Sequence, residues 1–250
     1  MPDPLRLVAA AAALALAPGP APAQTCAAPP YAGVDDPVLS AALATLARYP
    51  SLDAALRQVG PDLCRVDGVF GAMGYFEPAA NRVVVDAALD PGLQRAVLFH
   101  ELRHVDQFAR GVCPDLSLAM QAYARATWAL EADAATISLI IAWDLRAGGD
   151  PAPWDALAAL PRYAAMTDAF AAQMEAGAGL PDAGAAAFTS WYANAERLRD
   201  YYIAGCSTYL DEQDRTRLLP QYGGIGGAYF ARLCVLPDGS GYPCAEPPLD

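Results

Sequence analysis

The feature that most constrains this chain is the pentapeptide His-Glu-Leu-Arg-His at residues 100–104. The chain has only two histidines, His100 and His104, and both belong to this pentapeptide. On a helix, residues four apart lie on one face one turn apart, so these two imidazoles can bind one metal ion. Glu101 would then lie beside that face, within reach of a water molecule on the metal. This is the geometry that an H-E-x-x-H motif requires.

The residues around the motif predict that it lies on a helix. Asp90 suits an N-cap and Pro91 suits the first helical position. After Gly92 no Gly or Pro follows until Gly111, which suits a helix end. Apolar residues flank the histidine face, so we expect a buried helix whose imidazoles need partners. The alternative is a pair of hydrogen-bonded core histidines, and it leaves the absence of any other histidine unexplained.

A third metal ligand is needed, because a catalytic zinc ion commonly has three protein ligands and one open position. The chain has no third histidine and no C-x-x-C pair, so this ligand should be a carboxylate. Residues 116–146 contain no Gly or Pro and predict a long helix after the motif helix. Within it, Glu131 lies among small residues, on a face that another helix can approach closely. We therefore predict that Glu131 is the third ligand, the alternative being an ordinary helix charge.

Asp133 competes with Glu131 for this role, and the sequence leaves the choice open. The two residues are separated by about 200° around a helix, so both cannot easily bind one ion. The neighbours of Asp133 are mostly apolar, which makes an unpaired charge there costly. We expect a buried carboxylate that is structural or that orients a histidine N–H. Asp106 and Asp115 are weaker ligand candidates.

The rest of the pattern predicts a mostly α fold with one small β-hairpin or sheet (α+β). The hairpin is expected within residues 66–86, with Val69 and Phe70 in its first half. Its edge could pair with an extended peptide, or the hairpin could only cover the core. We expect further helices over residues 36–48, 51–59 (N-capped by Ser51), 154–175 and 185–210, and a loop over 177–184.

The first 23 residues have the pattern of a secretory signal peptide. Arg6 precedes an apolar run from Leu7 to Ala17 that is too short to span a bilayer, and Ala21-Pro22-Ala23 suits cleavage. Residues 24–250 are then expected to form a single exported domain, periplasmic or extracellular, with no membrane contact after cleavage. The net charge of −12 argues against nucleic acid as a partner.

All six cysteines lie after the predicted cleavage site. An even number of cysteines in an exported chain predicts three disulfides, and the sequence does not decide among the fifteen connectivities. Pairing of Cys26 with Cys64 is plausible. Pairing of Cys234 with Cys244 would close an irregular Pro/Gly-rich tail over about residues 220–250.

Two motifs together resemble a known family. The H-E-L-R-H motif with Gln107 three residues later, followed by Glu-Ala-Asp-Ala at 131–134, resembles the uncharacterised metallopeptidase family of exported bacterial proteins with H-E-L-R-H and E-A-D-A motifs. More distantly, the chain is similar to the gluzincins, the zincins whose third ligand is a Glu on a second helix. The resemblance covers about residues 64–147 and implies a zincin-like fold.

The same resemblance implies peptide hydrolysis by a zinc-bound water, with Zn²⁺ held by His100, His104 and Glu131 and with Glu101 as general base. A protein or peptide would be the substrate, although a non-peptide amide stays open. Tyr192, Tyr201 and Tyr202 are candidates to stabilise the oxyanion, and the sequence does not choose among them. The alternative function is a zincin-fold module that binds metal or peptide without turnover.

Overall fold

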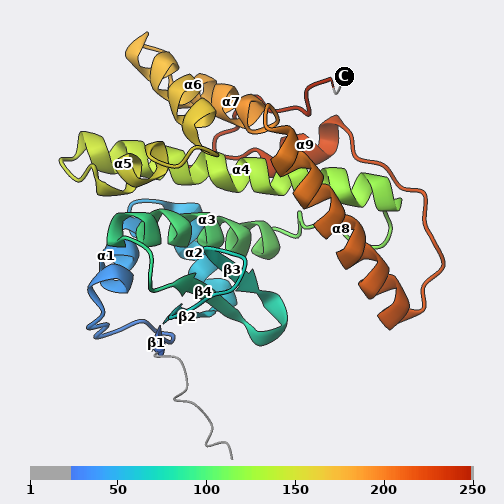
Figure 1. Cartoon of the computed structure of the whole chain (residues 1–250), viewed down its shortest axis with the longest axis horizontal. Coiled ribbons are helices and arrows are strands. Elements are labelled where there is room, and N and C mark those ends of the chain that lie inside the picture. The colour runs from blue at the N-terminus through green and yellow to red at the C-terminus, as the bar shows by residue number, and fades with distance from the viewer. Residues whose placement is uncertain (1–23, 249–250) are drawn as a thin grey trace, which may run out of the picture.

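The computed structural model describes residues 24–248, so the signal peptide predicted for residues 1–23 lies outside the described part. This part has nine α-helices, four short strands and one 3₁₀ turn (Figure 1). The predicted mostly α, α+β class is therefore confirmed. In chain order the first elements are β1 (Gln24–Ala27), α1 (Pro37–Leu46), α2 (Pro50–Val59), β2 (Asp62–Val66), β3 (Gly74–Glu77), the 3₁₀ turn (Pro78–Ala80) and β4 (Arg82–Asp86). They are followed by α3 (Pro91–Ala109), α4 (Met120–Ala147), α5 (Ala152–Ala158), α6 (Ala164–Glu175), α7 (Leu180–Trp191), α8 (Ala195–Thr216) and α9 (Gly227–Leu233).

The four strands form one sheet in the order β1-β2-β4-β3. β3 and β4 are the predicted antiparallel hairpin, and β2 pairs with β4 in parallel. β1 and β2 were not predicted, because segments of four and five residues carry too little periodicity and depend on pairing partners distant in sequence. The predicted strand residues Val69 and Phe70 lie instead in the loop before β3, where Phe70 is fully exposed. The sheet therefore ends in β3, whose outer edge has no strand partner in the described chain.

The helix predictions hold for the centres of the helices and fail at several ends. α2 begins at Pro50 after Tyr49, so Ser51 is not its N-cap. The helix predicted over 154–175 is broken between α5 and α6, where Pro161 removes a backbone donor. The loop predicted over 177–184 contains the first turn of α7, since Pro181 suits a helix start. The helix predicted over 185–210 is likewise divided between α7 and α8, and α8 is capped by Asn194.

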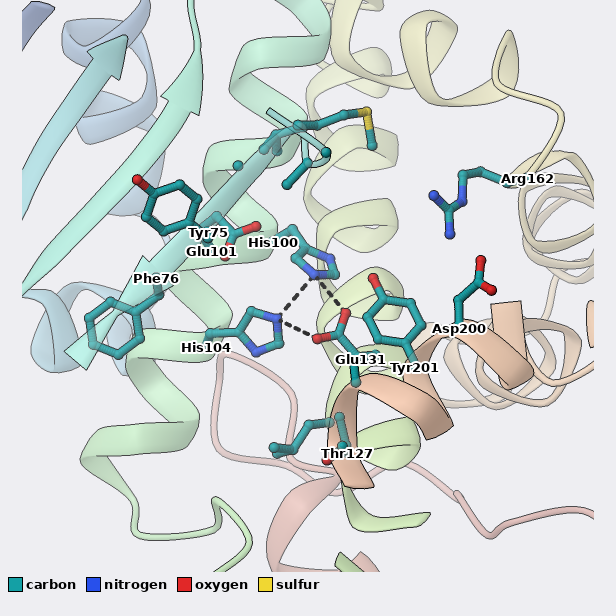
Figure 2. A pocket seen from close by; sticks show the side chains of 18 of the residues that line it. Tyr75, Phe76, His100, Glu101, His104, Thr127, Glu131, Arg162, Asp200 and Tyr201 are labelled. Carbon is teal, nitrogen blue, oxygen red and sulfur yellow. Dashed lines mark hydrogen bonds and ion pairs between the residues drawn. The ribbon is translucent and has the colours of Figure 1, made fainter. Parts of the chain in front are cut away.

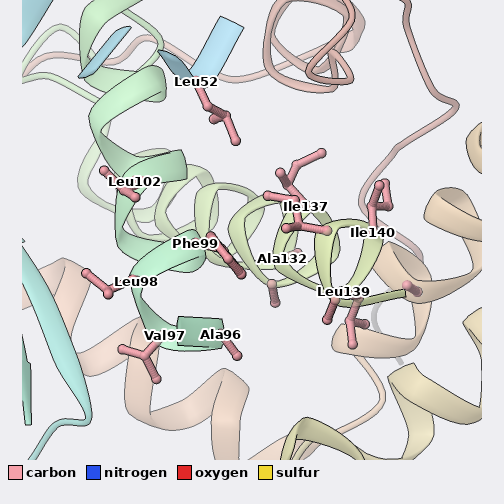
Figure 3. Packing of buried hydrophobic residues seen from close by; sticks show 14 of the residues in the cluster. Leu52, Ala96, Val97, Leu98, Phe99, Leu102, Ala132, Ile137, Leu139 and Ile140 are labelled. Carbon is pink, nitrogen blue, oxygen red and sulfur yellow. The ribbon is translucent and has the colours of Figure 1, made fainter. Parts of the chain in front are cut away.

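Helices α3 and α4 form the centre of the molecule (Figure 1). α3 contacts the sheet through β3 and β4 on one side and α4 on the other. Both helices carry fully buried side chains of the hydrophobic core, among them Phe99 of α3 and Ile137 and Leu139 on different sides of α4 (Figure 3). Small residues such as Ala96 and Ala132 are also buried, and they leave room for neighbouring elements to pack closely on both helices. α8 crosses α4, and Gly205 lies against Ala124, where an added Cβ would be 3.0 Å from the Ala124 Cα.

The described chain contains two disulfides, so the prediction of three is wrong. Cys26–Cys64 joins β1 to β2 at directly opposed positions, and Cys234–Cys244 closes the segment after α9, as anticipated for both pairs. Cys113 and Cys206 are unpaired. Cys113 lies in the loop before α4, whereas Cys206 lies beside Tyr202 on α8. Within residues 24–248 no helix has both the length and the apolarity needed to cross a bilayer.

Candidate active site

The two histidines of α3 face the same space, as their spacing predicts. Asp90 caps the helix by accepting from the Gly92 N–H, and the helix runs unbroken through the motif. The Nε2 atoms of His100 and His104 lie 3.1 Å apart, and their rings are nearly perpendicular. Two unprotonated ring nitrogens at this distance repel each other unless a proton or a cation lies between them.

Glu131 of α4 completes the group. Its carboxylate oxygens lie 3.4 Å from His100 Nε2 and 3.5 Å from His104 Nε2 (Figure 2). One ligand atom from each of the three side chains lies within 4.8 Å of the others. Burial alone would raise the pKa of Glu131, but the two imidazoles and the Tyr201 hydroxyl lower it to about 2. The carboxylate is therefore held ionised, ready to bind a cation.

Gln107, three residues after the motif, fixes the tautomer of His104. Its amide nitrogen donates to the Leu130 carbonyl and to Asp133, at 3.0 and 2.7 Å. The amide oxygen must then face His104 Nδ1, 2.7 Å away, and it can only accept a hydrogen bond. Nδ1 of His104 therefore carries the proton, and the lone pair of Nε2 faces His100 and Glu131. Two imidazole nitrogens and one carboxylate that converge in this way fit a zinc ion.

Glu101 is buried beside these three side chains and lines the same pocket. Burial raises its pKa to about 7; Glu131 raises it too, whereas His104 and the Phe76 backbone N–H lower it. Strand β3 approaches α3 closely here because residue 74 is glycine. A Cβ on Gly74 would lie 2.6 Å from a Val97 methyl carbon. The edge strand thus holds Glu101 in place.

A pocket of about 940 Å³ contains all four of these residues. Strand β3 forms one side of it, and the turn between α5 and α6 together with α8 forms the other (Figure 2). Tyr201 of α8 lines the pocket, and its pKa is raised first by the charge of Glu131 and then by burial. Of the three tyrosines considered, it alone lines this pocket: Tyr192 is buried elsewhere, and Tyr202 packs on Trp128.

Asp133 is separate from the group of His100, His104 and Glu131, and it is fully buried. It accepts two hydrogen bonds from Arg103, at 2.7 and 3.0 Å, and one each from Gln107 and Tyr242. It reaches His104 only through Gln107, so the expected role in orienting a histidine is indirect. Arg103 was not anticipated as its partner, although an arginine on a helix predicted to be buried implies a buried acid.

The two weaker ligand candidates lie elsewhere. Asp106 forms ion pairs with Arg103 and Arg110, and Asp115 accepts from Ser117 in the loop before α4. Of the predicted site residues, the structure thus brings together His100, Glu101, His104 and Glu131, and sets Asp133 behind them.

No curated protein and no solved structure matches the chain. The family model described as "Putative metallopeptidase family (DUF6782)" matches residues 11–244, and its peptidase assignment fits a zincin-like core. Because this match spans nearly the whole chain, the protein belongs to that metallopeptidase family.

Proposed function

We propose that this protein is an exported zinc-dependent peptidase. The observation that carries the proposal is the convergence of His100, His104 and Glu131 on one point of a pocket that also contains Glu101. The donor set of two imidazoles and one carboxylate leaves a fourth position for water. When bound, zinc would supply an acidified water and polarise the scissile carbonyl.

Two side chains near this point would carry out proton transfer and stabilise the oxyanion. Glu101 accepts the proton of the attacking water and returns it to the leaving amine. A buried carboxylate next to apolar groups suits this exchange, because its neutral form is accessible near neutral pH. The Tyr201 hydroxyl lines the same pocket and can donate to the oxyanion of the tetrahedral intermediate.

The open edge of β3 offers a place for an extended peptide. Met73 O accepts from Asp86 N at the start of the β3–β4 pairing, so alternation turns the backbone groups of Gly74 and Phe76 outward. The Phe76 N–H already interacts with Glu101, which leaves the Gly74 N–H and the two carbonyls for a substrate. Both residues line the pocket beside Glu101. A substrate strand paired there would run across the metal position, which favours a peptide over other amides.

Export is part of the proposal. Disulfides persist in oxidising compartments, and the two in this chain suit a periplasmic or extracellular protein. The pattern of residues 1–23 supports the same location.

The test combines metal analysis with proteolysis. Purified protein is measured for bound zinc and then incubated with denatured casein, with and without a chelator. We expect about one zinc per chain and chelator-sensitive cleavage, and we expect Glu101→Gln to keep zinc while losing about 10²–10⁴-fold in rate. Zinc without cleavage would favour the binding module, and a protein without zinc would overturn the metal-dependent function altogether.

A further inference from the structure

Arg162 is the one arginine among the described residues that line the main pocket. It lies in the turn between α5 and α6, and Figure 2 shows its guanidinium directed into the pocket, across from strand β3. Within residues 24–248 no carboxylate lies within 4.0 Å of this guanidinium. Asp200, drawn beside it, pairs instead with Arg199 at 3.2 Å. Arg162 therefore presents an unneutralised charge to the pocket.

A second arginine, Arg197, is buried near Arg162. Arg197 of α8 is only 4% exposed, and it too has no carboxylate within 4.0 Å in the described chain. Its guanidinium donates to the Trp191 carbonyl and lies over the rings of Trp191 and Tyr163, at 5.3 and 5.8 Å from their centres. Burial lowers the pKa of Arg197, and the charge of Arg162 lowers it further. A buried cation without a counter-ion is costly, so this wall of the pocket favours an anion.

The positive wall lies next to the proposed metal site. Tyr201, Glu131 and Arg162 line the same pocket, and Figure 2 shows the Tyr201 ring between Glu131 and Arg162. The other charged residues that line the pocket are acidic: Glu101, Glu131 and Asp200. Glu101 and Glu131 would repel an anionic group from the metal side of the pocket, and Arg162 is the one lining side chain in the described chain that can attract it.

On the basis of the proposed function, we propose that Arg162, backed by Arg197, forms a subsite for a carboxylate of the peptide substrate close to the scissile bond. A guanidinium binds a carboxylate through two parallel hydrogen bonds, which fixes the orientation of the substrate as well as its affinity. The carboxylate can belong to an acidic side chain or to the C-terminus of the peptide. The chain as a whole carries a net charge of −12, so selection of anionic peptides requires such a local site.

The test measures binding without turnover, on zinc-loaded Glu101→Gln protein, by calorimetry. Three acetylated alanine tripeptides are compared: one amidated and neutral, one amidated with a central Asp, and one with a free C-terminus. We expect at least one carboxylate peptide to bind about tenfold more tightly than the neutral one. Whichever peptide gains identifies the source of the carboxylate. Arg162→Gln should abolish the preference and Arg162→Lys should keep part of it.

Arg215→Gln is the matched control, because Arg215 also lies on α8 but neither it nor its partner Glu212 lines the pocket. It should leave the preference intact. A preference that survives Arg162→Gln would reflect direct binding of the carboxylate to zinc and would overturn the subsite, as would equal binding of the three peptides or binding of none. The comparison is repeated on protein without zinc. An Arg162-dependent preference in a protein that takes up no zinc would support the subsite while overturning the zinc-peptidase function.

Discussion

Helices α3 and α4 meet along two polar seams that differ in how their charges are matched. The open seam consists of His100, His104 and Glu131, and it faces the pocket. The closed seam consists of Arg103, Gln107 and Asp133, all fully buried. In the closed seam, Arg103 donates two hydrogen bonds to Asp133 and one to Asp106, and it also binds the carbonyls of Leu233 and Val235.

The difference shows how one helix pair separates stability from chemistry. Glu131 and Asp133 are two residues apart, so they point to opposite sides of α4. Asp133 has a guanidinium partner, and the closed seam is complete in the protein alone. The open seam has a carboxylate, two convergent imidazoles and no cationic side chain, so it lacks the positive charge that Arg103 supplies in the closed seam. A mutation in the closed seam should therefore affect folding, and one in the open seam should affect metal binding.

The largest effect is expected for Asp133→Ala. It leaves the buried charge of Arg103 without its main partner, and the loss of one partner from a buried pair costs about 3–5 kcal/mol. Urea unfolding of the metal-free protein measures this loss. Glu131→Ala is the matched change in the other seam and should alter stability by less than about 1 kcal/mol. Equal destabilisation by the two variants would show that the closed seam contributes no more to stability than the open seam.

The second effect is on zinc affinity, which should depend on the open seam rather than on the closed one. Glu131→Gln keeps the size of the side chain and removes its charge, so we expect zinc affinity to fall by more than about 100-fold, beyond the loss typical for a residue behind the ligands. Competition with a fluorescent chelator measures the affinity. If Glu131→Gln bound zinc as the unchanged protein does, Glu131 would not be a ligand.

A smaller effect is expected when the Cys234–Cys244 disulfide is removed by replacing both residues with Ser. This disulfide spans ten residues, and chain entropy predicts a loss of about 2–3 kcal/mol in stability. The clipped segment includes Val235 and Tyr242, which bind the closed seam. We expect reduced unfolding free energy with zinc affinity unchanged within about twofold. A large loss of zinc affinity in the folded variant would show that the two seams are not separable in this way.

Much of this arrangement could be predicted from local sequence. The spacing of His100 and His104, the Asp90 cap and the small residues around Glu131 are local signals, and each led to a helix face that the structure contains. The separation of Glu131 from Asp133 followed from helix geometry alone.

What the sequence did not predict depends on contacts between distant segments. Strand β1 forms by pairing with β2, and β2 also pairs with β4. Segments of four or five residues have too short a pattern to predict these strands. Tyr201 and Tyr202 are neighbours on α8, and only the side of the helix that carries Tyr201 faces the pocket, whereas Tyr192 lies at the C-terminal end of α7. Arg103 and Tyr242 meet at Asp133 from sites 30 and 109 residues away.

The smallest effect concerns Gln107, which joins the two seams. Gln107→Met keeps the length of the side chain but can no longer accept from His104 Nδ1 or donate to Asp133. Loss of an outer partner of a metal-binding histidine typically lowers affinity by about 10–100-fold, and we expect zinc affinity to fall within this range. Tyr242→Phe is the control, because it removes a hydrogen bond of the same 2.7 Å length to the same carboxylate but does not touch the histidine. If both variants lose equal affinity, Gln107 supports the fold alone; if only Gln107→Met does, the closed seam positions the imidazole of the open one.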